Sequence, residues 1–481
     1  MKYKLLIVSI IGLTAIVLGC KQVNNQTVEV QKPNILFIFT DDQGYQDLGC
    51  YGHPYIKTPN LDKLASEGTR FNQFYVNATV CSPSRAAFMT GRYPASERIH
   101  GYIADDAKNL RRNMPNWLDE NVFTVADLAK KTGYVTGHYG KWHLGHSKDA
   151  PDPSEYGFDE HRTFVSNGRG WDEHGNLTDK DEVHAAATTD RSLVDSSGFW
   201  ANSTDYFVDE AIKFLERNKE KSFYLNLWTF LPHSTLMPSQ EQFDEYADLD
   251  VISPDSFSGW MREDAKNEEN FESYLRKYMA AVTSVDKAIG RLLDKLDQLG
   301  LSDNTLVFFT SDNGPEVPSN IAGMGSPGVF RGRKRSMYEG GIRMPCIARW
   351  PGKIPEGHVD STSVIAGVDW LPTIAAILNQ DTPDEIDGIS ALDALQGEPW
   401  HRQQPLFWEY RFTVRGNPQY KAPGLCIRKG DWKMFTNEEQ TRTELYNIVK
   451  DPQERYNIAE ENPEIVKELL PLLLSWKKSI P

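Results

Sequence analysis

Carboxylate and amide side chains stand directly after two short apolar segments of this chain. The first segment is followed by Asp41 and Asp42, and the second, after one serine, by Asp312 and Asn313. Oxygen donors without cysteine suit a hard cation such as Ca²⁺ or Mg²⁺, whereas zinc sites use more cysteine or histidine. Asp, Asn and Gly are also ordinary turn residues, so each pair taken alone is open to that interpretation. Because the pattern occurs twice, we favour a metal site.

A cysteine stands where a short helix is expected to begin. Pro83 suits the first turn of such a helix and Gly91 its end. Cys81 would then lie at the helix N-terminus, where free backbone amides and the helix dipole favour an anion. Arg85 lies one turn further on, and its guanidinium can bind an oxyanion. The alternative is a buried structural cysteine, which is the usual fate of a lone thiol.

Two further apolar segments are followed by basic or imidazole groups. Residues 134–139 lead into Lys141 and His143, and residues 223–230 lead through a proline to His233. Ligands of open parallel sheets bind outside the carboxyl ends of the strands. If these segments are neighbouring strands, their polar groups converge on one rim.

The elements that must position these groups alternate along the chain. Apolar segments of strand length are separated by amphipathic segments, for which we expect helices over residues 58–68, 124–131, 204–218 and 274–299. This alternation predicts an α/β fold with a mainly parallel sheet that is flanked by helices. Residues 145–203 resist assignment, and a long irregular stretch in a compact protein is often a binding loop.

The pattern changes toward the C-terminus. Short strand candidates separated by turn residues precede a final helix over residues 462–476. We therefore predict a smaller antiparallel sheet plus helix as a C-terminal subdomain over residues 396–481, after a catalytic domain over residues 32–395.

The N-terminal residues 1–20 resemble a signal peptide. Two lysines precede an apolar stretch over residues 5–18, which is too short to span a membrane as a helix. The stretch ends in Val-Leu-Gly-Cys20, which resembles a bacterial lipobox whose cysteine is lipidated; an ordinary cleaved signal peptide is the alternative. Residues 21–31 are polar and would form a tether. We expect the protein in the periplasm or at the cell surface of a Gram-negative bacterium, with the lipid as its only attachment to the membrane.

The overall composition excludes several classes of protein. The chain has 481 residues, 40% hydrophobic and 25% charged, which is typical of a globular protein and not of a disordered or fibrous one. The net charge is -15, so no nucleic-acid partner is expected. Five cysteines are too few for a disulfide scaffold, and any pairing among Cys50, Cys346 and Cys426 is left open.

The motifs taken together resemble one enzyme family. Cys-Ser-Pro-Ser-Arg from Cys81 to Arg85, with Gly-Arg soon after, resembles the signature of the type I formylglycine-dependent sulfatases of the alkaline-phosphatase-like superfamily. Further motifs follow in that family's order: DDQG at 41–44, GKWHLG at 140–145, Pro-His at 232–233, SDNG at 311–314, RGRKRSMYEGG at 331–341 and ELYNI at 444–448. The resemblance implies an alkaline-phosphatase-like α/β domain with a smaller C-terminal subdomain, as in secreted bacterial carbohydrate sulfatases.

The resemblance also implies roles for individual residues. It implies one Ca²⁺ per chain, held by Asp41, Asp42, Asp312 and Asn313, with Cys81 near the ion after a maturase has oxidised it to formylglycine (3-oxoalanine). It implies that Arg85 steadies the aldehyde hydrate, and that the sulfate is held and protons are moved by Lys141, His143, His233 and Lys334. In this scheme Asp312 is the base for the nucleophile, His233 protonates the leaving alcohol, and His143 helps to release the sulfate.

The chemistry of a sulfate ester explains these residue types. Its sulfur is shielded by negative oxygens, so cations must bind those oxygens before a nucleophile can approach. An aldehyde hydrate offers one hydroxyl for attack and keeps a second for release of the sulfate, whereas a serine or thiol lacks the second.

The chain departs from the family around Lys334. Arg333 and Arg335 stand where many members have small residues. They are candidates for binding a further anionic group on the substrate; a solvated run of charges is the alternative.

Three functions are compatible with the sequence. The first is a sulfatase for oligosaccharides from a sulfated polysaccharide, of the algal type (ulvan, carrageenan or fucoidan) or a glycosaminoglycan; an aryl sulfate is a further candidate substrate. The second is a phosphonate monoester hydrolase or phosphodiesterase that uses the same nucleophile. The third is a lipoprotein that binds sulfated glycans without turning them over. The complete set of motifs favours the first, with a role in polysaccharide degradation.

Overall fold

The computed structural model describes residues 32–164, 170–172, 174, 176–178, 196–249, 252–319 and 323–481. Lys32–Pro481 forms one compact unit. The predicted signal peptide, the tether and Cys20 lie outside the described residues. None of the helices in the described part of the chain is long and apolar enough to cross a membrane.

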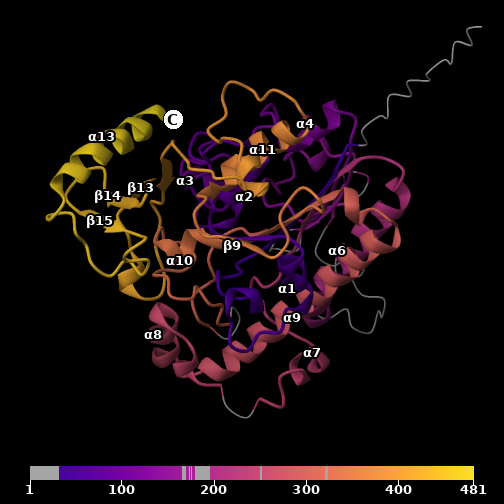
Figure 1. The fold of residues 1–481 in the computed structure, drawn as a ribbon, viewed down its shortest axis with the longest axis horizontal. Coiled ribbons are helices and arrows are strands. Elements are labelled where there is room, and N and C mark those ends of the chain that lie inside the picture. Colours follow the sequence, from indigo (N-terminus) through magenta and orange to yellow (C-terminus); the bar gives the residue numbers. More distant parts are fainter. Residues whose placement is uncertain are drawn as a thin grey trace, which may run out of the picture. The chain divides into compact units, whose positions relative to one another are not determined.

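A nine-stranded mixed sheet forms the centre of this unit (Figure 1). Its strands are β1 (Asn34–Thr40), β2 (Thr69–Tyr75), β3 (Val135–Lys141), β4 (Glu160–Phe164), β7 (Phe223–Trp228), β8 (Thr305–Ser311), β9 (Arg343–Arg349), β10 (His358–Asp360) and β11 (Ile365–Ala366). The order is β10-β2-β9-β8-β1-β7-β3-β4, with β11 also paired to β2. Only β9 runs antiparallel to its neighbours, so the predicted mainly parallel sheet is confirmed.

Helices cover both faces of the sheet, as β1 shows. All seven residues of β1 are buried, which is typical of a parallel strand between two helical layers. Ile35, Phe37 and Phe39 face a core shared with α2, α4 and α11, and Leu36 and Ile38 face α1, α6 and α9. The helices are α1 (Pro59–Ser66), α2 (Cys81–Thr90), α3 (Asp106–Arg111), α4 (Val125–Lys131), α6 (Ser196–Asn218), α7 (Gln240–Asp244), α8 (Gly259–Asn267), α9 (Phe271–Gln298), α10 (Glu339–Ile342), α11 (Trp370–Ile377), α12 (Leu392–Leu395) and α13 (Pro463–Ser479).

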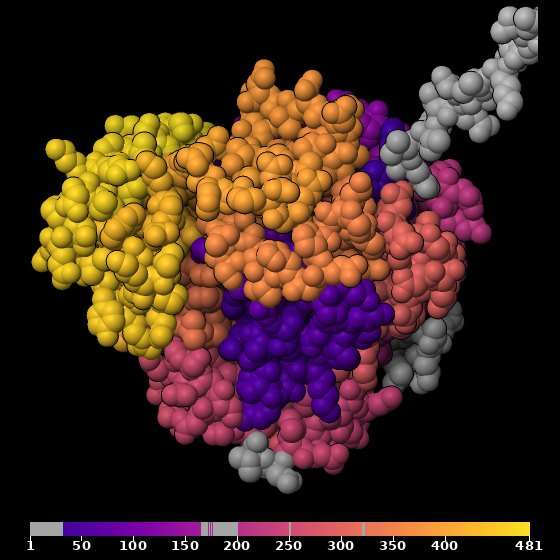
Figure 2. All heavy atoms as spheres, in the orientation of Figure 1, coloured from indigo at the N-terminus to yellow at the C-terminus, as the bar shows by residue number. Residues whose placement is uncertain are grey.

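The predicted C-terminal antiparallel sheet is confirmed. It contains β12 (Leu406–Glu409), β13 (Leu425–Lys429), β14 (Trp432–Thr436) and β15 (Thr443–Asn447), and α13 packs on one of its faces. Trp408 and Phe435 belong to the same hydrophobic core as Phe37 of the central sheet. In the space-filling view, the yellow C-terminal residues accordingly lie against the orange residues that precede them (Figure 2). A small two-stranded sheet pairs β5 (Gly170–Trp171) with β6 (Leu177–Thr178).

A buried ionic cluster joins the C-terminal sheet to the start of α10, directly after the loop that contains residues 331–338. Lys433 of β14 lies 2.8 Å from Glu339 and 3.0 Å from Glu454, and Glu454 accepts a hydrogen bond from the Glu339 amide at 2.7 Å. Burial raises the pKa of Glu454 to about 7 even though Lys433 opposes the rise.

This pKa predicts a pH-dependent stability. Between about pH 4.5 and 7 the native protein keeps the Glu454 proton that the unfolded chain has lost, so raising the pH favours unfolding. We expect Glu454→Gln to become more stable relative to the wild type as pH rises through this window, measured by urea unfolding at pH 5 and pH 8. The exposed Glu460→Gln is the control. A constant difference between wild type and Glu454→Gln across the window would contradict the prediction.

Candidate active site

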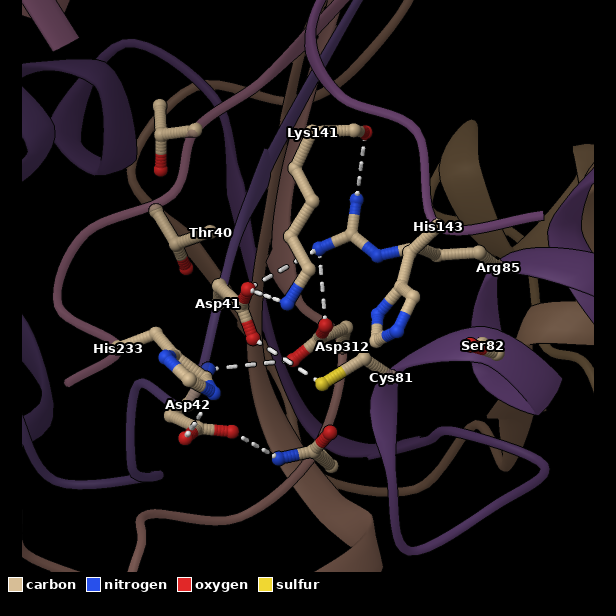
Figure 3. Close-up of polar contacts among 12 residues, drawn as sticks. Thr40, Asp41, Asp42, Cys81, Ser82, Arg85, Lys141, His143, His233 and Asp312 are labelled. Atoms are coloured by element: carbon tan, nitrogen blue, oxygen red, sulfur yellow. Dashed lines mark hydrogen bonds and ion pairs between the residues drawn. The ribbon is translucent and has the colours of Figure 1, made fainter. Parts of the chain in front are cut away.

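The paired strands β1 and β8 bring two acidic motifs together. Thr40 pairs with Ser311 in parallel register, so the residues that follow each strand leave the sheet side by side. The Asp42 amide donates to Asp312 Oδ1 at 3.1 Å (Figure 3). Asn313 Nδ2 donates to Asp42 Oδ1 at 2.7 Å. The expected convergence at the carboxyl ends of the strands is therefore what the structure shows.

Cys81 is the first residue of α2 and points at this acidic group. Its side chain is 2% exposed, and Sγ lies 3.3 Å from Asp41 Oδ1. Phe88, further along α2, lies 5.1 Å from the Phe37 ring and 4.8 Å from the Phe39 ring, so the helix is anchored on β1. Burial, reinforced by Asp41, raises the pKa of the Cys81 thiol above its usual range. At neutral pH the unmodified sulfur is therefore protonated.

Four side chains each offer one atom that could bind a metal ion, and these atoms lie within 4.8 Å of one another. The four residues are Asp41, Asp42, Cys81 and His233. A single ion could be contacted by several of them. Three of the four side chains are fully buried and His233 is partly exposed, so the group has an inner wall and one side open to a ligand.

Three buried cations face the carboxylates. Arg85 donates to Asp312 Oδ2 at 2.9 Å and to the Lys141 carbonyl at 3.1 Å. Lys141 bonds to Asp41 Oδ2, and Lys334 donates to Asp42 Oδ2 at 2.7 Å. We call the carboxylates of Asp41, Asp42 and Asp312 the acidic rim. Because buried charges are costly unless they are paired, the three cations stabilise the rim by neutralising it.

The cations divide the acidic rim into groups of different basicity. Burial raises the pKa of Asp312 to about 7, and the charge of Asp41 adds to the rise. Burial also acts on Asp41, but Lys141, His233 and Arg85 outweigh it and hold the pKa of Asp41 well below its usual value. Burial alone would lower the pKa of Lys334, yet the surrounding acidic groups, Asp42 first, together outweigh it and raise that pKa.

Two of the predicted histidines lie at the same site. His233 Nε2 is 3.7 Å from Asp42 Oδ2, and burial, helped by Lys334, lowers the pKa of His233 to about 4. His143 lies beyond the end of β3, and its Nε2 is 3.1 Å from the carbonyl oxygen of Ile103. Burial and then Lys141 hold the pKa of His143 well below its usual value. Both rings are therefore neutral at pH 7 in this arrangement.

A cavity of about 430 Å³ opens over these groups. The cavity is lined by Cys81, His143, His233 and Lys334. Its other lining residues include five for which no role is predicted: Tyr102, Ile103, Ala104, Asp105 and His146. The loop that precedes α3 supplies Tyr102 and Asp105, and no motif marks it. Its only local signal is Asp105 itself, which caps α3 by accepting a hydrogen bond from the Lys108 amide at 2.9 Å.

Arg333 and Arg335 have different surroundings although only Lys334 separates them. Arg333 is 1% exposed, and its guanidinium donates to Asp264 at 2.5 Å and to the carbonyl of Gly325 at 2.7 Å. It does not line the cavity, so the prediction that Arg333 binds substrate is corrected: it ties α8 to the loop. Arg335 does line the cavity, where Glu316 holds its guanidinium through contacts of 2.6 and 2.8 Å.

The cysteines in the described part of the chain are all free. They are Cys50, Cys81, Cys346 and Cys426. The question left open by their spacing is therefore settled: no disulfide joins any two of these four residues.

Comparison with known proteins places this site in a family. The sulfatase family model matches residues 33–380, and the model of the C-terminal region of N-sulphoglucosamine sulphohydrolase matches residues 325–478. Human arylsulfatase A is 34% identical, over 92% of this chain and 87% of its own length. An N-acetylgalactosamine-6-O-sulfatase from Bacteroides thetaiotaomicron is 27% identical, over 96% of this chain and 97% of its own.

A solved structure agrees with these sequence relatives. BT4656 in complex with D-glucosamine-2-N,6-O-disulfate superposes with a TM-score of 0.68 at 25% identity, over 93% of this chain and 98% of the other. The family model covers well over half of the chain, and the fold agrees with that of the solved relative. The chain therefore belongs to the sulfatase family and is a sulfuric ester hydrolase.

Proposed function

We propose that this sulfatase removes sulfate from a sulfated oligosaccharide, with a glycosaminoglycan-type 6-O-sulfated hexosamine as the leading substrate. The observation that carries the proposal is the meeting of Cys81, the acidic rim and two lysines in one buried cluster, which borders a cavity lined by Cys81 and Lys334. The relative from Bacteroides thetaiotaomicron is a 6-O-sulfatase of N-acetylgalactosamine, and the BT4656 structure contains a 6-O-sulfated glucosamine. These two names support the choice of sugar and position.

The donor set fits Ca²⁺. Asp41, Asp42, Asp312 and Asn313 offer hard oxygen atoms, which are the ligands that this ion prefers. Among the described residues, Asn313 Oδ1 is buried without a hydrogen-bond partner, which is an atom that a cation would satisfy. When bound, Ca²⁺ would supply a fixed positive charge opposite the sulfate oxygens.

Cys81 is the candidate for conversion to formylglycine by a maturase. It begins a ten-residue helix and faces the acidic rim, which is where an attacking group is needed. When formed, the aldehyde hydrate would supply a hydroxyl nucleophile and a second hydroxyl that allows release of the sulfate.

The remaining side chains hold the substrate and move protons. Lys141 and Lys334 present ammonium groups to the sulfate oxygens, and Arg85 fixes Asp312 in place through its charged hydrogen bond. Asp312 accepts the proton of the nucleophile. The negative charge of a bound sulfate ester would oppose the effect of Lys334 and raise the pKa of His233. His233, on the open side of the group, would then be protonated and deliver that proton to the leaving alcohol, and His143 would assist the release of sulfate.

The test compares esters and sugars in one preparation. We expect sulfate release from defined sulfated oligosaccharides, with N-acetylhexosamine 6-O-sulfates hydrolysed faster than ulvan, carrageenan or fucoidan fragments and faster than aryl sulfates. Sulfate and phosphate esters of one alcohol are assayed in parallel, and the Cys81 peptide is analysed by mass. Faster phosphate than sulfate hydrolysis would favour the phosphonate monoester hydrolases instead. Binding without turnover by enzyme that carries the converted residue would favour a glycan-binding lipoprotein.

The same proposal places the enzyme in the periplasm or at the cell surface, anchored through a lipid on Cys20. The support is the apolar N-terminal stretch and the cysteine that follows it. We expect labelled fatty acid to be incorporated into the wild-type protein and not into Cys20→Ala. Equal labelling of the two would contradict the anchor.

A further inference from the structure

A second cavity of about 200 Å³ adjoins the active-site cavity. Arg335 lines both, so the two cavities share a wall. Most of the second lining comes from the segment of residues 410–424, which connects β12 to β13 of the C-terminal sheet. A substrate longer than one sugar could therefore extend from one cavity into the other.

The second cavity is basic although the chain as a whole is acidic. The described residues that line it include Arg335, Arg411 and Lys421 and no carboxylate, in a chain whose net charge is -15. The guanidinium of Arg335 donates hydrogen bonds to the Glu316 carboxylate, which compensates its charge. Arg335 therefore contributes mainly to the shape of the cavity. Arg411 and Lys421 are exposed and face the cavity with less of their charge compensated.

The two exposed cations have few partners of their own. Arg411 donates to the Arg112 carbonyl at 3.0 Å and lies over the Phe412 ring at 5.8 Å. Lys421 makes no side-chain hydrogen bond or ion pair with any residue in the described part of the chain. Its ammonium is therefore available to an anion from outside.

Arg112 connects the linings of the two cavities by stacking on an aromatic ring of each. Arg112 lies 4.5 Å from the ring of Tyr102, which lines the active-site cavity, and 4.8 Å from the ring of Phe412, which lines the second. The two stacking contacts fix the Phe412 ring at the border of the second cavity. Aromatic faces beside a few charged groups are the usual lining of a ligand site.

Resting on the function proposed above, we propose that this second cavity is a subsite for an anionic sugar, with Arg411 and Lys421 as its charged ligands. The sugar would be the neighbour of the unit whose sulfate is removed, and its carboxylate or sulfate group would bind the two cations. Phe412 would pack against the apolar face of that sugar. The enzyme would accordingly prefer an oligosaccharide with an anionic neighbour over a single sulfated sugar.

The test uses four substrates that share one scissile ester. They are N-acetylgalactosamine 6-O-sulfate alone, and the same sugar linked to a neutral hexose, to a uronic acid or to a sulfated hexose. We expect kcat/KM of the wild type to be highest for a substrate with an anionic neighbouring sugar. Comparison of the uronic acid substrate with the sulfated hexose substrate identifies which anion the subsite prefers. Lys421→Gln should lower the ratio of anionic-disaccharide to monosaccharide kcat/KM about tenfold, which corresponds to about 1.4 kcal/mol. The preference should also weaken with rising salt, because exposed charges are screened.

Lys450→Gln is the matched control, since Lys450 is an exposed lysine elsewhere in the C-terminal sheet region. Equal kcat/KM for neutral and anionic neighbours, or an unchanged ratio in Lys421→Gln and Lys421→Glu, would overturn the subsite while leaving the sulfatase proposal intact. Absence of sulfate release from all four substrates would overturn the proposed substrate and the subsite together.

Discussion

Cys81→Ser is expected to lose sulfatase turnover by about 10⁴-fold or more, because serine cannot provide the two hydroxyls of the aldehyde hydrate. Serine fits the buried position of Sγ beside Asp41, so the protein should fold normally. Its single hydroxyl provides no second oxygen with which the enzyme can be restored after sulfate transfer. The measurement is sulfate release under multiple-turnover conditions, with unfolding curves that show an intact fold. Cys81→Ala should be equally inactive.

Cys50→Ser is the control for this experiment. Cys50 is a free, partly exposed cysteine that does not line the active-site cavity. It should keep wild-type turnover, and only the wild type and Cys50→Ser should show the converted residue in the Cys81 peptide. Turnover by Cys81→Ser within tenfold of the wild type would refute the assignment of the nucleophile.

Asp312→Asn is expected to lower kcat/KM about 10³-fold, which is the scale of losing one general base. Asparagine keeps the shape of the side chain and can still accept the Asp42 amide hydrogen bond, so the rim should stay in place. The substitution removes one of the carboxylates offered to Ca²⁺ and leaves Arg85 without its 2.9 Å charged partner. Calcium affinity, measured by calorimetric titration, should fall in the same variant.

Asp303→Asn controls for the loss of a carboxylate near β8. Asp303 is exposed just before the strand, at the end opposite the acidic rim. It should retain both activity and calcium affinity. If saturating Ca²⁺ restores Asp312→Asn fully, Asp312 is a metal ligand and not a base; activity within tenfold of the wild type without added Ca²⁺ would contradict both roles.

Much of the fold could be predicted because local patterns suffice for isolated elements. The run of five apolar residues between Asn34 and Thr40 predicts a strand buried on both faces, and it forms one, β1. A proline at the first turn marks the start of α1, and a glycine at φ 67 follows the end of α2. These signals act between residues that are close along the chain.

Strands β2 and β9 were not predicted, and their pairing explains why. β9 contains Pro345, which argues against a strand within a sheet. The structure accommodates it at an irregularity, because the register of β2 against β9 shifts between Phe71 and Phe74, opposite the proline. Only the partner strand, some 270 residues away in the sequence, supplies this irregularity.

The motifs of the sequence by themselves determined the candidate nucleophile and the acidic rim, because each motif follows a strand or begins a helix. The tertiary structure alone decided that Arg333 is buried and Arg335 lines the cavity, because Asp264 of α8 pairs with Arg333 and Glu316 pairs with Arg335. It alone brought Tyr102 to the active-site cavity and residues 410–424 to the second cavity beside it. Their positions depend on packing between segments hundreds of residues apart, and no local pattern records that packing.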